Sequence, residues 1–205
     1  MVTPVSGMLG VVIDEEPWMT PPVPGLLTGE EVIAGASSTV RDFWAWALSN
    51  LRANTVRGTL AEYLVACAVG SGGHPRIEWD AYDVLTPGNR RIEVKSGAYL
   101  QAWEQPRHSK IIFRGLRAQT WTSRDGYSDG PSYNADVYVF AVLTATEHEV
   151  YDALDTRQWN FWVLSAAQVQ QTNQESMGLA KVIKLAGAAV GYEDLAAAIE
   201  RTLDG

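Results

Sequence analysis

The chain has 205 residues, of which 46% are hydrophobic and 20% are charged, which is enough apolar material for one sizeable folded domain. Its single cysteine, Cys67, excludes an internal disulfide and fits a reducing, cytoplasmic setting. No apolar run approaches the ~18 residues of a membrane span, and the first residues lack the pattern of a secretion signal. The net charge of −8 argues against a polyanionic partner unless the basic residues are clustered.

Residues 1–36 are expected to form a poorly ordered N-terminal arm, because prolines interrupt any periodic pattern there. Residues 37–205 are expected to form a single domain that begins with a helix near 39–50. The apolar face of this helix is expected to contain Phe43, Trp44, Ala47 and Leu48.

A second helix is expected near 55–69, where the glycine-rich residues 70–73 end it. Its apolar stripe is expected to contain Leu60, Leu64 and Cys67, which predicts a buried cysteine. Glu62 lies off this stripe, so it either faces solvent or belongs to a site at the edge of the helix.

Strands are expected next, and a continuous apolar run at 136–143 predicts a central strand that is covered on both faces. A polar loop is expected at 118–134, and such long loops are usually functional or mobile. The other expected elements are strands near 76–85, 90–96, 110–114 and 159–164, a short helix at 166–173 and a C-terminal helix at 192–203. For 176–190 no element is predicted.

The strands near 76–85 and 90–96 are expected to form a hairpin, since Pro87-Gly88-Asn89 between them is a strong turn signal. If Thr86 faces Arg90 across the turn, Asp83 lies directly opposite Glu93, with the two Cβ atoms roughly 4.5–5.5 Å apart. Lys95 is two residues after Glu93 and therefore shares its face. The hairpin thus gathers two carboxylates and one ammonium group on one patch.

Two carboxylates this close repel each other unless a cation lies between them or one takes up a proton. Mg²⁺ suits such a place because it binds oxygen ligands and keeps several waters. A lysine beside the ion can orient an attacking water or neutralise charge that develops on a phosphate. These groups are what hydrolysis of a phosphodiester requires. The alternative is an exposed hairpin with alternating charges, in which Lys95 offsets two acids.

Asp83, a gap of nine residues and then Glu93-Val94-Lys95 resemble the PD-(D/E)xK nuclease superfamily, which has the restriction-endonuclease-like fold. Tyr82 stands where many members have a proline. Glu62, on the second expected helix, matches the additional acidic residue that many members carry upstream. Gln101 resembles the glutamine that follows the lysine in several branches.

The resemblance implies an α/β fold with a central mixed β-sheet flanked by helices, and Mg²⁺-dependent hydrolysis of DNA, with Mn²⁺ as a substitute. It assigns metal binding to Asp83, Glu93 and the Val94 carbonyl, and the positioning or activation of water to Lys95. Glu62 and Gln101 are further candidates for catalysis. A homodimer is a natural expectation, since cutting a duplex takes two active sites or two events, and restriction, phage defence or DNA repair are suitable contexts.

Two further acids, Glu78 and Asp80, lie close enough in sequence to replace Asp83 as the metal ligand. No Cys/His zinc cluster, Walker loop, nucleophile elbow or dinucleotide fingerprint occurs in the sequence, so no nucleotide cofactor is expected. A rival function from another class is a DNA- or protein-binding module that has kept this fold without catalysis.

Residues 86–124 contain eight basic and two acidic residues, a local charge of +6, whereas the remainder of the chain carries −14. This segment is expected to bind phosphates, unless the fold scatters it as a solvated surface. The candidate nucleic-acid contacts are Arg90, Arg107, His108, Lys110, Arg114 and Arg124. Trp103 and Trp121 lie in the same segment and are candidates for stacking on bases, whereas Trp44, Trp46, Trp159 and Trp162 are expected in the core.

Overall fold

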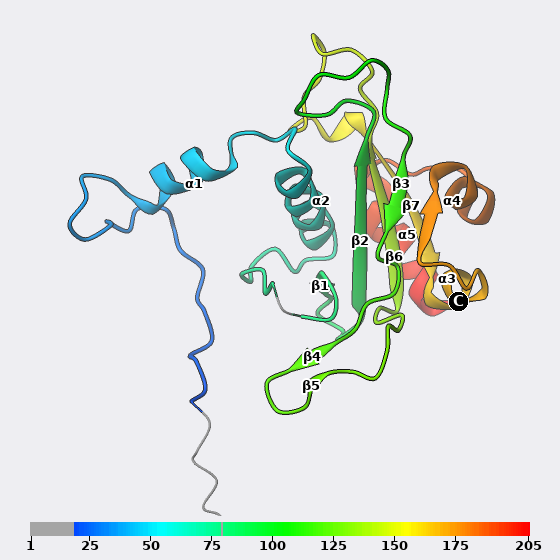
Figure 1. Ribbon diagram of the computed structural model, residues 1–205, viewed down its shortest axis with the longest axis horizontal. Coiled ribbons are helices and arrows are strands. Elements are labelled where there is room, and N and C mark those ends of the chain that lie inside the picture. Colours follow the sequence, from blue (N-terminus) through cyan, green and yellow to red (C-terminus); the bar gives the residue numbers. More distant parts are fainter. Residues whose placement is uncertain (1–18, 79) are drawn as a thin grey trace, which may run out of the picture.

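The computed structural model describes residues 19–78 and 80–205, and its centre is a four-stranded sheet (Figure 1). The strands follow the order β1-β2-β6-β7, with β2 parallel to β6 and the other two pairs antiparallel. They are β1 (Val84–Leu85), β2 (Arg91–Ala98), β6 (Val137–Leu143) and β7 (Trp159–Ser165). The expected α/β architecture with a mixed central sheet flanked by helices is therefore confirmed.

Strand β6 is the centre of the core, because all seven of its residues are buried. Its odd-numbered residues, such as Val139, pack in one hydrophobic cluster and its even-numbered residues, such as Phe140, pack in the other. The apolar run therefore arises because both faces of this strand are covered, as the sequence predicted.

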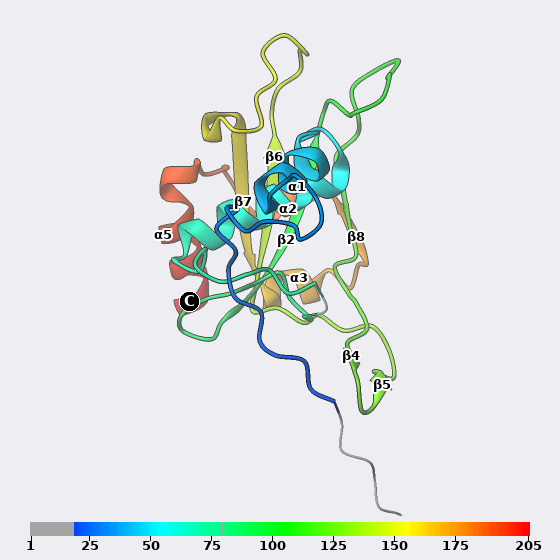
Figure 2. The same cartoon turned by 90° about the vertical axis from the view of Figure 1, so that its left-hand side faces the viewer.

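Two helices cover one face of the sheet, α2 (Asn54–Ala68) and α5 (Tyr192–Asp204). The other face is covered by α3 (Ala166–Gln171), by α4 (Leu179–Ala186) and by a small sheet, as Figures 1 and 2 show. This small sheet pairs β3 (Ile112–Arg114) with β8 (Ser176–Gly178). The capping box that Ser165 and Gln168 form sets the start of α3.

Helix α2 begins and ends close to its predicted limits, but its buried stripe is shifted by one residue. Ala61 and Val65 are buried, whereas Leu60 and Leu64 are only partly buried. The prediction that Cys67 is buried was wrong, since its side chain is exposed. Arg57 also lies on this buried stripe. Its guanidinium donates hydrogen bonds to the Arg52 carbonyl and to the Asn54 side chain, which offsets the cost of burying its charge.

Helix α1 (Val40–Leu48) forms where it was predicted, and a capping box of Thr39 and Asp42 stabilises its N-terminus. It contains no buried residue and lies to one side of the sheet in Figure 1, so the predicted core-facing stripe is wrong. Trp46 is 85% exposed, against the prediction, while Trp159 and Trp162 are buried as predicted. The Trp44 ring instead lies beside Gly29, where a Cβ would be only 3.1 Å from it.

The N-terminal arm predicted at 1–36 lies partly outside the described residues, and its described part contains no helix and no multi-residue strand. The strand expected at 76–85 is reduced to two residues, since positions 80–83 form a bend. In the loop at 118–134, β4 (Trp121–Thr122) and β5 (Gly126–Tyr127) form a short hairpin. Within the described part of the chain, no helix is long and apolar enough to span a bilayer.

Candidate active site

The hairpin between β1 and β2 has the predicted register. Val84 pairs with Ile92, Leu85 pairs with Arg91, and the Thr86 N–H donates to the Arg90 carbonyl at 2.9 Å. The turn closes through Asn89, whose φ of 57° lies in the left-handed region that asparagine tolerates well.

Asp83 lies one residue before the paired part of β1 and departs from the predicted register. Its N–H donates to the Ile92 carbonyl at 3.1 Å, so Asp83 and Val84 both lie opposite Ile92. Its carboxylate Oδ2 accepts the Val94 N–H at 2.7 Å. The Val94 N–H is thus bonded to a side-chain carboxylate and not to a backbone carbonyl of β1. The regular pairing of β1 with β2 ends at this point.

Glu93 and Lys95 point to the same face of β2, as predicted from their spacing. Lys95 Nζ lies 2.5 Å from Glu93 Oε1, and the two side chains are 20% and 17% exposed. The backbone after β3 passes beside this pair, since a Cβ on Gly115 would lie 3.7 Å from Lys95 Nζ. The pair is therefore largely enclosed, which strengthens its electrostatic interaction.

Glu62 reaches the same region from α2 and is bound by an arginine that the sequence analysis did not single out. Arg76 Nε lies 2.5 Å from Glu62 Oε2, and the Glu62 side chain is 15% exposed. No sequence motif marks Arg76, because the loop that carries it has no regular pattern. We call Glu62, Asp83 and Glu93 the acid cluster, since the Asp83 charge raises the pKa of both other members and the Glu62 charge raises that of Glu93.

Burial raises the pKa of all three acids in this cluster. For Glu93, burial and then the neighbouring Asp83 charge raise the pKa to about 7, against the opposing effect of Lys95. Burial raises the pKa of Asp83 although the Val94 N–H and Lys95 oppose it, and it raises that of Glu62 against the hydrogen bond from Arg76. Three carboxylates thus share two cations, Lys95 and Arg76, and are short of positive charge.

This shortage suits a divalent cation. Within the described residues, no three His, Cys, Asp or Glu side chains are placed so that they could hold a metal ion together. Asp83 and Glu93 nevertheless supply two partly buried carboxylates, and Mg²⁺ is usually held by one or two carboxylates, waters and substrate phosphates. The donors that are present therefore fit Mg²⁺ or Mn²⁺ with much of the coordination left to water and substrate.

Gln101 is held in a different part of the chain, beyond the far end of β2. Its side-chain amide donates to the Ala98 carbonyl at 2.9 Å and to the Ser109 hydroxyl at 3.1 Å. At roughly 3.3 Å per residue, Ala98 lies about 10 Å along the strand from Lys95. These bonds give Gln101 a role in shaping the loop at 99–110.

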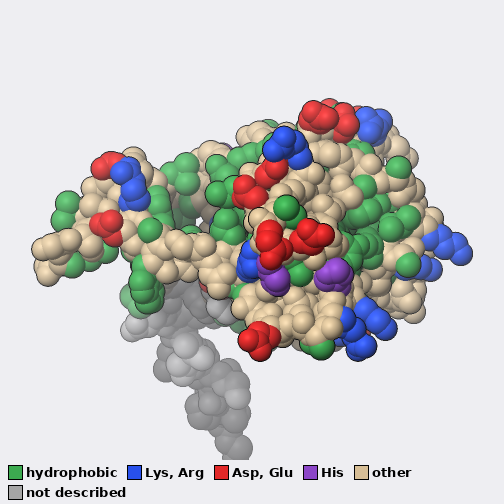
Figure 3. Space-filling model, turned by 90° about the horizontal axis from the view of Figure 1, so that it is seen from above, with side chains coloured by type: hydrophobic (Ala, Val, Ile, Leu, Met, Phe, Trp, Pro, Cys, Tyr) green, Lys and Arg blue, Asp and Glu red, His purple; other side chains and the backbone are tan. Residues whose placement is uncertain are grey.

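The basic segment does not form one continuous surface. In Figure 1, the loop at 99–110 lies beyond one end of β2, and the β4–β5 hairpin that Arg124 joins lies near the other end. Arg90 lies 3.8 Å from Asp136, and His108 contacts the Thr146 carbonyl. Figure 3 shows acidic as well as basic side chains on the end of the molecule seen from above.

Three of the other proposed contacts are exposed basic side chains, Arg107, Lys110 and Arg114. The alternative metal ligands Glu78 and Asp80 are exposed too, whereas Asp83 is bound to the edge of β2. The geometry therefore favours Asp83 over both as the partner of Glu93.

Comparisons with models of protein families, with curated proteins and with solved structures give no match to this chain. The resemblance to the nuclease superfamily therefore rests on the sequence motif alone.

Proposed function

We propose that this chain is a Mg²⁺-dependent DNA nuclease of the restriction-endonuclease-like type, with its active site at the acid cluster. The observation that carries the proposal is the meeting of Asp83, Glu93 and Lys95 at one partly buried place on the edge of β2. Burial raises the pKa of both acids, as is common at catalytic sites.

In this proposal Asp83 and Glu93 bind the metal, with the Val94 carbonyl as a third ligand, and Glu62 supports the site from α2. The bound ion supplies a Lewis acid for the phosphate oxygens. Lys95 positions the attacking water and offsets charge on the phosphate. The water gives up one proton to solvent as its oxygen bonds to phosphorus, the bond from phosphorus to the leaving deoxyribose oxygen breaks, and that oxygen takes up a proton from solvent.

The test is a cleavage assay on supercoiled, linear, single-stranded and branched DNA, with Mg²⁺ or Mn²⁺ and with chelator. We expect metal-dependent cleavage by the wild type and none by Asp83→Asn. The matched control is Asp136→Asn, which changes the aspartate that Arg91 binds at the other end of the same hairpin. Cleavage by Asp83→Asn at the wild-type rate would refute the assignment.

One observation favours a second candidate function, a binding module without catalysis. Lys95 already contacts Glu93 and Arg76 already contacts Glu62, as in an ion-pair network that serves only structure. This alternative predicts DNA or protein binding with no cleavage on any of the four substrates with either metal.

A further inference from the structure

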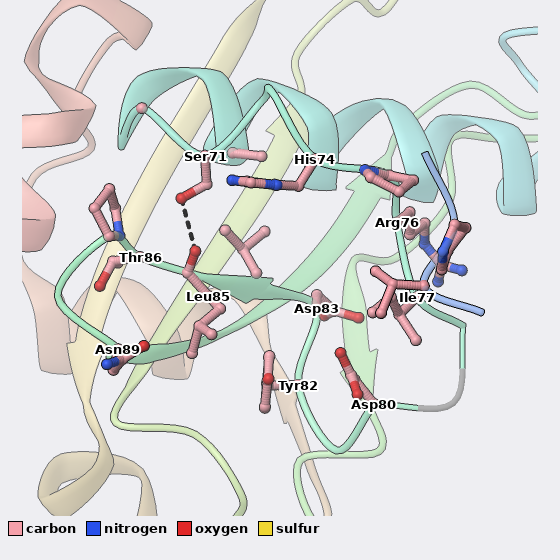
Figure 4. A pocket seen from close by; sticks show the side chains of 17 residues that line it. Ser71, His74, Arg76, Ile77, Asp80, Tyr82, Asp83, Leu85, Thr86 and Asn89 are labelled. Carbon is pink, nitrogen blue, oxygen red and sulfur yellow. Dashed lines mark hydrogen bonds between the residues drawn. The ribbon is translucent and has the colours of Figure 1, made fainter. Parts of the chain in front are cut away.

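A cavity of about 510 Å³ lies beside the acid cluster, between the end of α2, the loop at 70–83 and the β1–β2 hairpin (Figure 4). Asp83 and Arg76 belong both to its wall and to the surroundings of the cluster. Figure 4 shows the Asp83 carboxylate on the side of the cavity where Arg76 and Ile77 lie. A molecule that is held at the cluster through a phosphate group therefore has a hollow of this size next to it.

The walls of this cavity combine an apolar side with polar groups. Ile77, Val84 and Leu85 supply apolar surface, and Tyr82 adds a partly buried aromatic ring. The hydrogen-bonding side chains around them are Ser71, His74, Asp80, Thr86 and Asn89. An apolar slot with polar groups at its border suits a nucleobase, which has flat apolar faces and a polar edge.

We propose that this cavity binds one unstacked nucleotide of a DNA strand, next to the phosphodiester that the acid cluster hydrolyses. The inference rests on the proposed nuclease function and specifies its substrate. The cavity volume lies within the roughly 300–1,000 Å³ of small-molecule sites. Enzymes that act on an extruded nucleotide enclose it in such a pocket and hold it by stacking and by hydrogen bonds.

Arg76 links the cavity to the phosphate. Its Nε bonds to Glu62, and its side chain remains 41% exposed. A guanidinium carries five N–H donors, so those on the two terminal nitrogens remain for a phosphate oxygen. Arg76 is thus placed to contact the phosphate of a nucleotide whose base lies in the cavity.

The described part of the N-terminal segment leaves the cavity open. Val23 and Pro24 also line it, but Val23 is 90% exposed and therefore covers little of the wall. A nucleotide from another molecule thus has access without displacement of a buried segment.

The consequence is a preference among substrates. A nucleotide inside an intact duplex has to be unpaired and unstacked before it enters the cavity, which costs free energy. In a single strand, at a gap or at a frayed end the nucleotide is already unpaired, so most of this free energy is not required. We therefore expect single-stranded or gapped DNA to be cleaved faster than an intact duplex of the same sequence.

The test is calorimetric titration of the full chain with 2′-deoxyadenosine 5′-monophosphate, and in parallel with inorganic phosphate. We expect the nucleotide to bind more tightly than phosphate, and Ile77→Trp to weaken it by about tenfold or more, the order of affinity that base stacking contributes. Ile77 is 51% exposed, so the larger side chain fills the cavity with little effect on the core. The matched control is Val150→Trp on a distant exposed loop, which is 58% exposed before the change and should leave binding intact.

Tyr82→Ala is a second variant, which removes the ring and decides the question if Ile77→Trp does not fold. Equal nucleotide affinity in wild type and the folded cavity variants, or no nucleotide binding at millimolar concentration, would overturn the cavity assignment even if the protein cleaves DNA. Nucleotide binding with the expected variant pattern but without cleavage would support the cavity site and refute the nuclease function.

Discussion

Asp136 and the acid cluster both lie beside β2, and they differ in how the chain neutralises their negative charge. Asp136 lies at the start of the strand, where it accepts the Arg91 N–H at 2.8 Å and faces the guanidinium groups of Arg90 and Arg91. Partial burial alone would raise its pKa, but these contacts hold the pKa of Asp136 below the usual 3.8. The acid cluster lies further along the strand, where Glu93 belongs to β2 and Asp83 accepts the Val94 N–H, and there burial raises the pKa of each acid.

The difference separates a structural carboxylate from a candidate functional one. The chain itself supplies Asp136 with enough positive charge, so this residue needs no ligand. The acid cluster keeps its carboxylates in an unfavourable environment, which a protein tolerates where a ligand or a reaction uses it. Four measurements test whether this contrast is real.

The largest expected effect is on cleavage. Lys95→Met keeps the length of the side chain but removes its charge, so it should lower the cleavage rate by about 10²–10³, the usual contribution of one positioned group to transition-state stabilisation. DNA binding should change little, because one phosphate contact among several is a small share of the affinity. Single-turnover cleavage and a filter-binding assay measure the two quantities.

Lys181→Met, on an exposed position of α4, is the control and should cleave at the wild-type rate. If Lys95→Met also cleaves at that rate, Lys95 has no catalytic role and the Glu93–Lys95 pair is structural.

The second effect is on stability without metal. The folded protein holds a proton on Glu93 up to a pH of about 7, whereas the unfolded chain releases it near 4.5. The free energy of unfolding should therefore decrease as the pH rises through this window, by on the order of 3 kcal/mol at 1.36 kcal/mol per pH unit. Chemical denaturation in chelator measures it, and Glu93→Gln should flatten the profile.

Asp136 should show the opposite sign in the same experiment. Its pKa is lowered in the folded state, so its stabilising contribution is present above 3.8 and is lost only as the pH falls further. Glu175→Gln, on an exposed loop, is the neutral control. A Glu93→Gln profile as steep as that of the wild type would remove the basis for the contrast.

The third effect is the response to metal. Mg²⁺ or Mn²⁺ at 100 times its dissociation constant should stabilise the folded state by about 2.7 kcal/mol, because it binds the folded form only. For a chain of this size that is a rise in melting temperature of roughly 5–10 °C. Asp83→Ala should abolish the rise, and Asp136→Asn should retain it. An undiminished rise in Asp83→Ala would place the metal elsewhere.

The sequence predicts the local features of this site well and its long-range features poorly. The hairpin register follows from the turn residues and the strand period, so the pairing of Val84 with Ile92 and the shared face of Glu93 and Lys95 were confirmed. The bend that brings the Asp83 carboxylate onto the Val94 N–H was not predictable, because it depends on where strand pairing stops. Arg76 was missed because its partner lies 14 residues away on another element.

The same division holds for the fold. The buried strand β6 was predicted because an apolar run needs cover on both faces, whatever covers it. Helix α1 also carries large apolar side chains, yet Phe43 and Trp46 are exposed in the described part of the chain. Amphipathic periodicity identifies a helix and the face that can be buried, but burial depends on a partner surface that the periodicity does not contain.

The smallest expected effect concerns the basic segment at 86–124, because the fold places Arg107 and Arg114 in different surroundings. Arg114 is the residue before Gly115, which lies beside Lys95, whereas Arg107 lies in the loop beyond the far end of β2. DNA that is bound at the acid cluster should therefore contact Arg114 and not Arg107.

Arg114→Ala should lower the slope of log affinity against log salt by about 0.9 for duplex DNA, or about 0.7 for a single strand, equally for all sequences. Arg107→Ala should change the slope less, and Arg201→Ala, an exposed arginine on α5, should leave it unchanged. A larger change for Arg107→Ala than for Arg114→Ala would mean that DNA approaches along the 99–110 loop, away from the acid cluster.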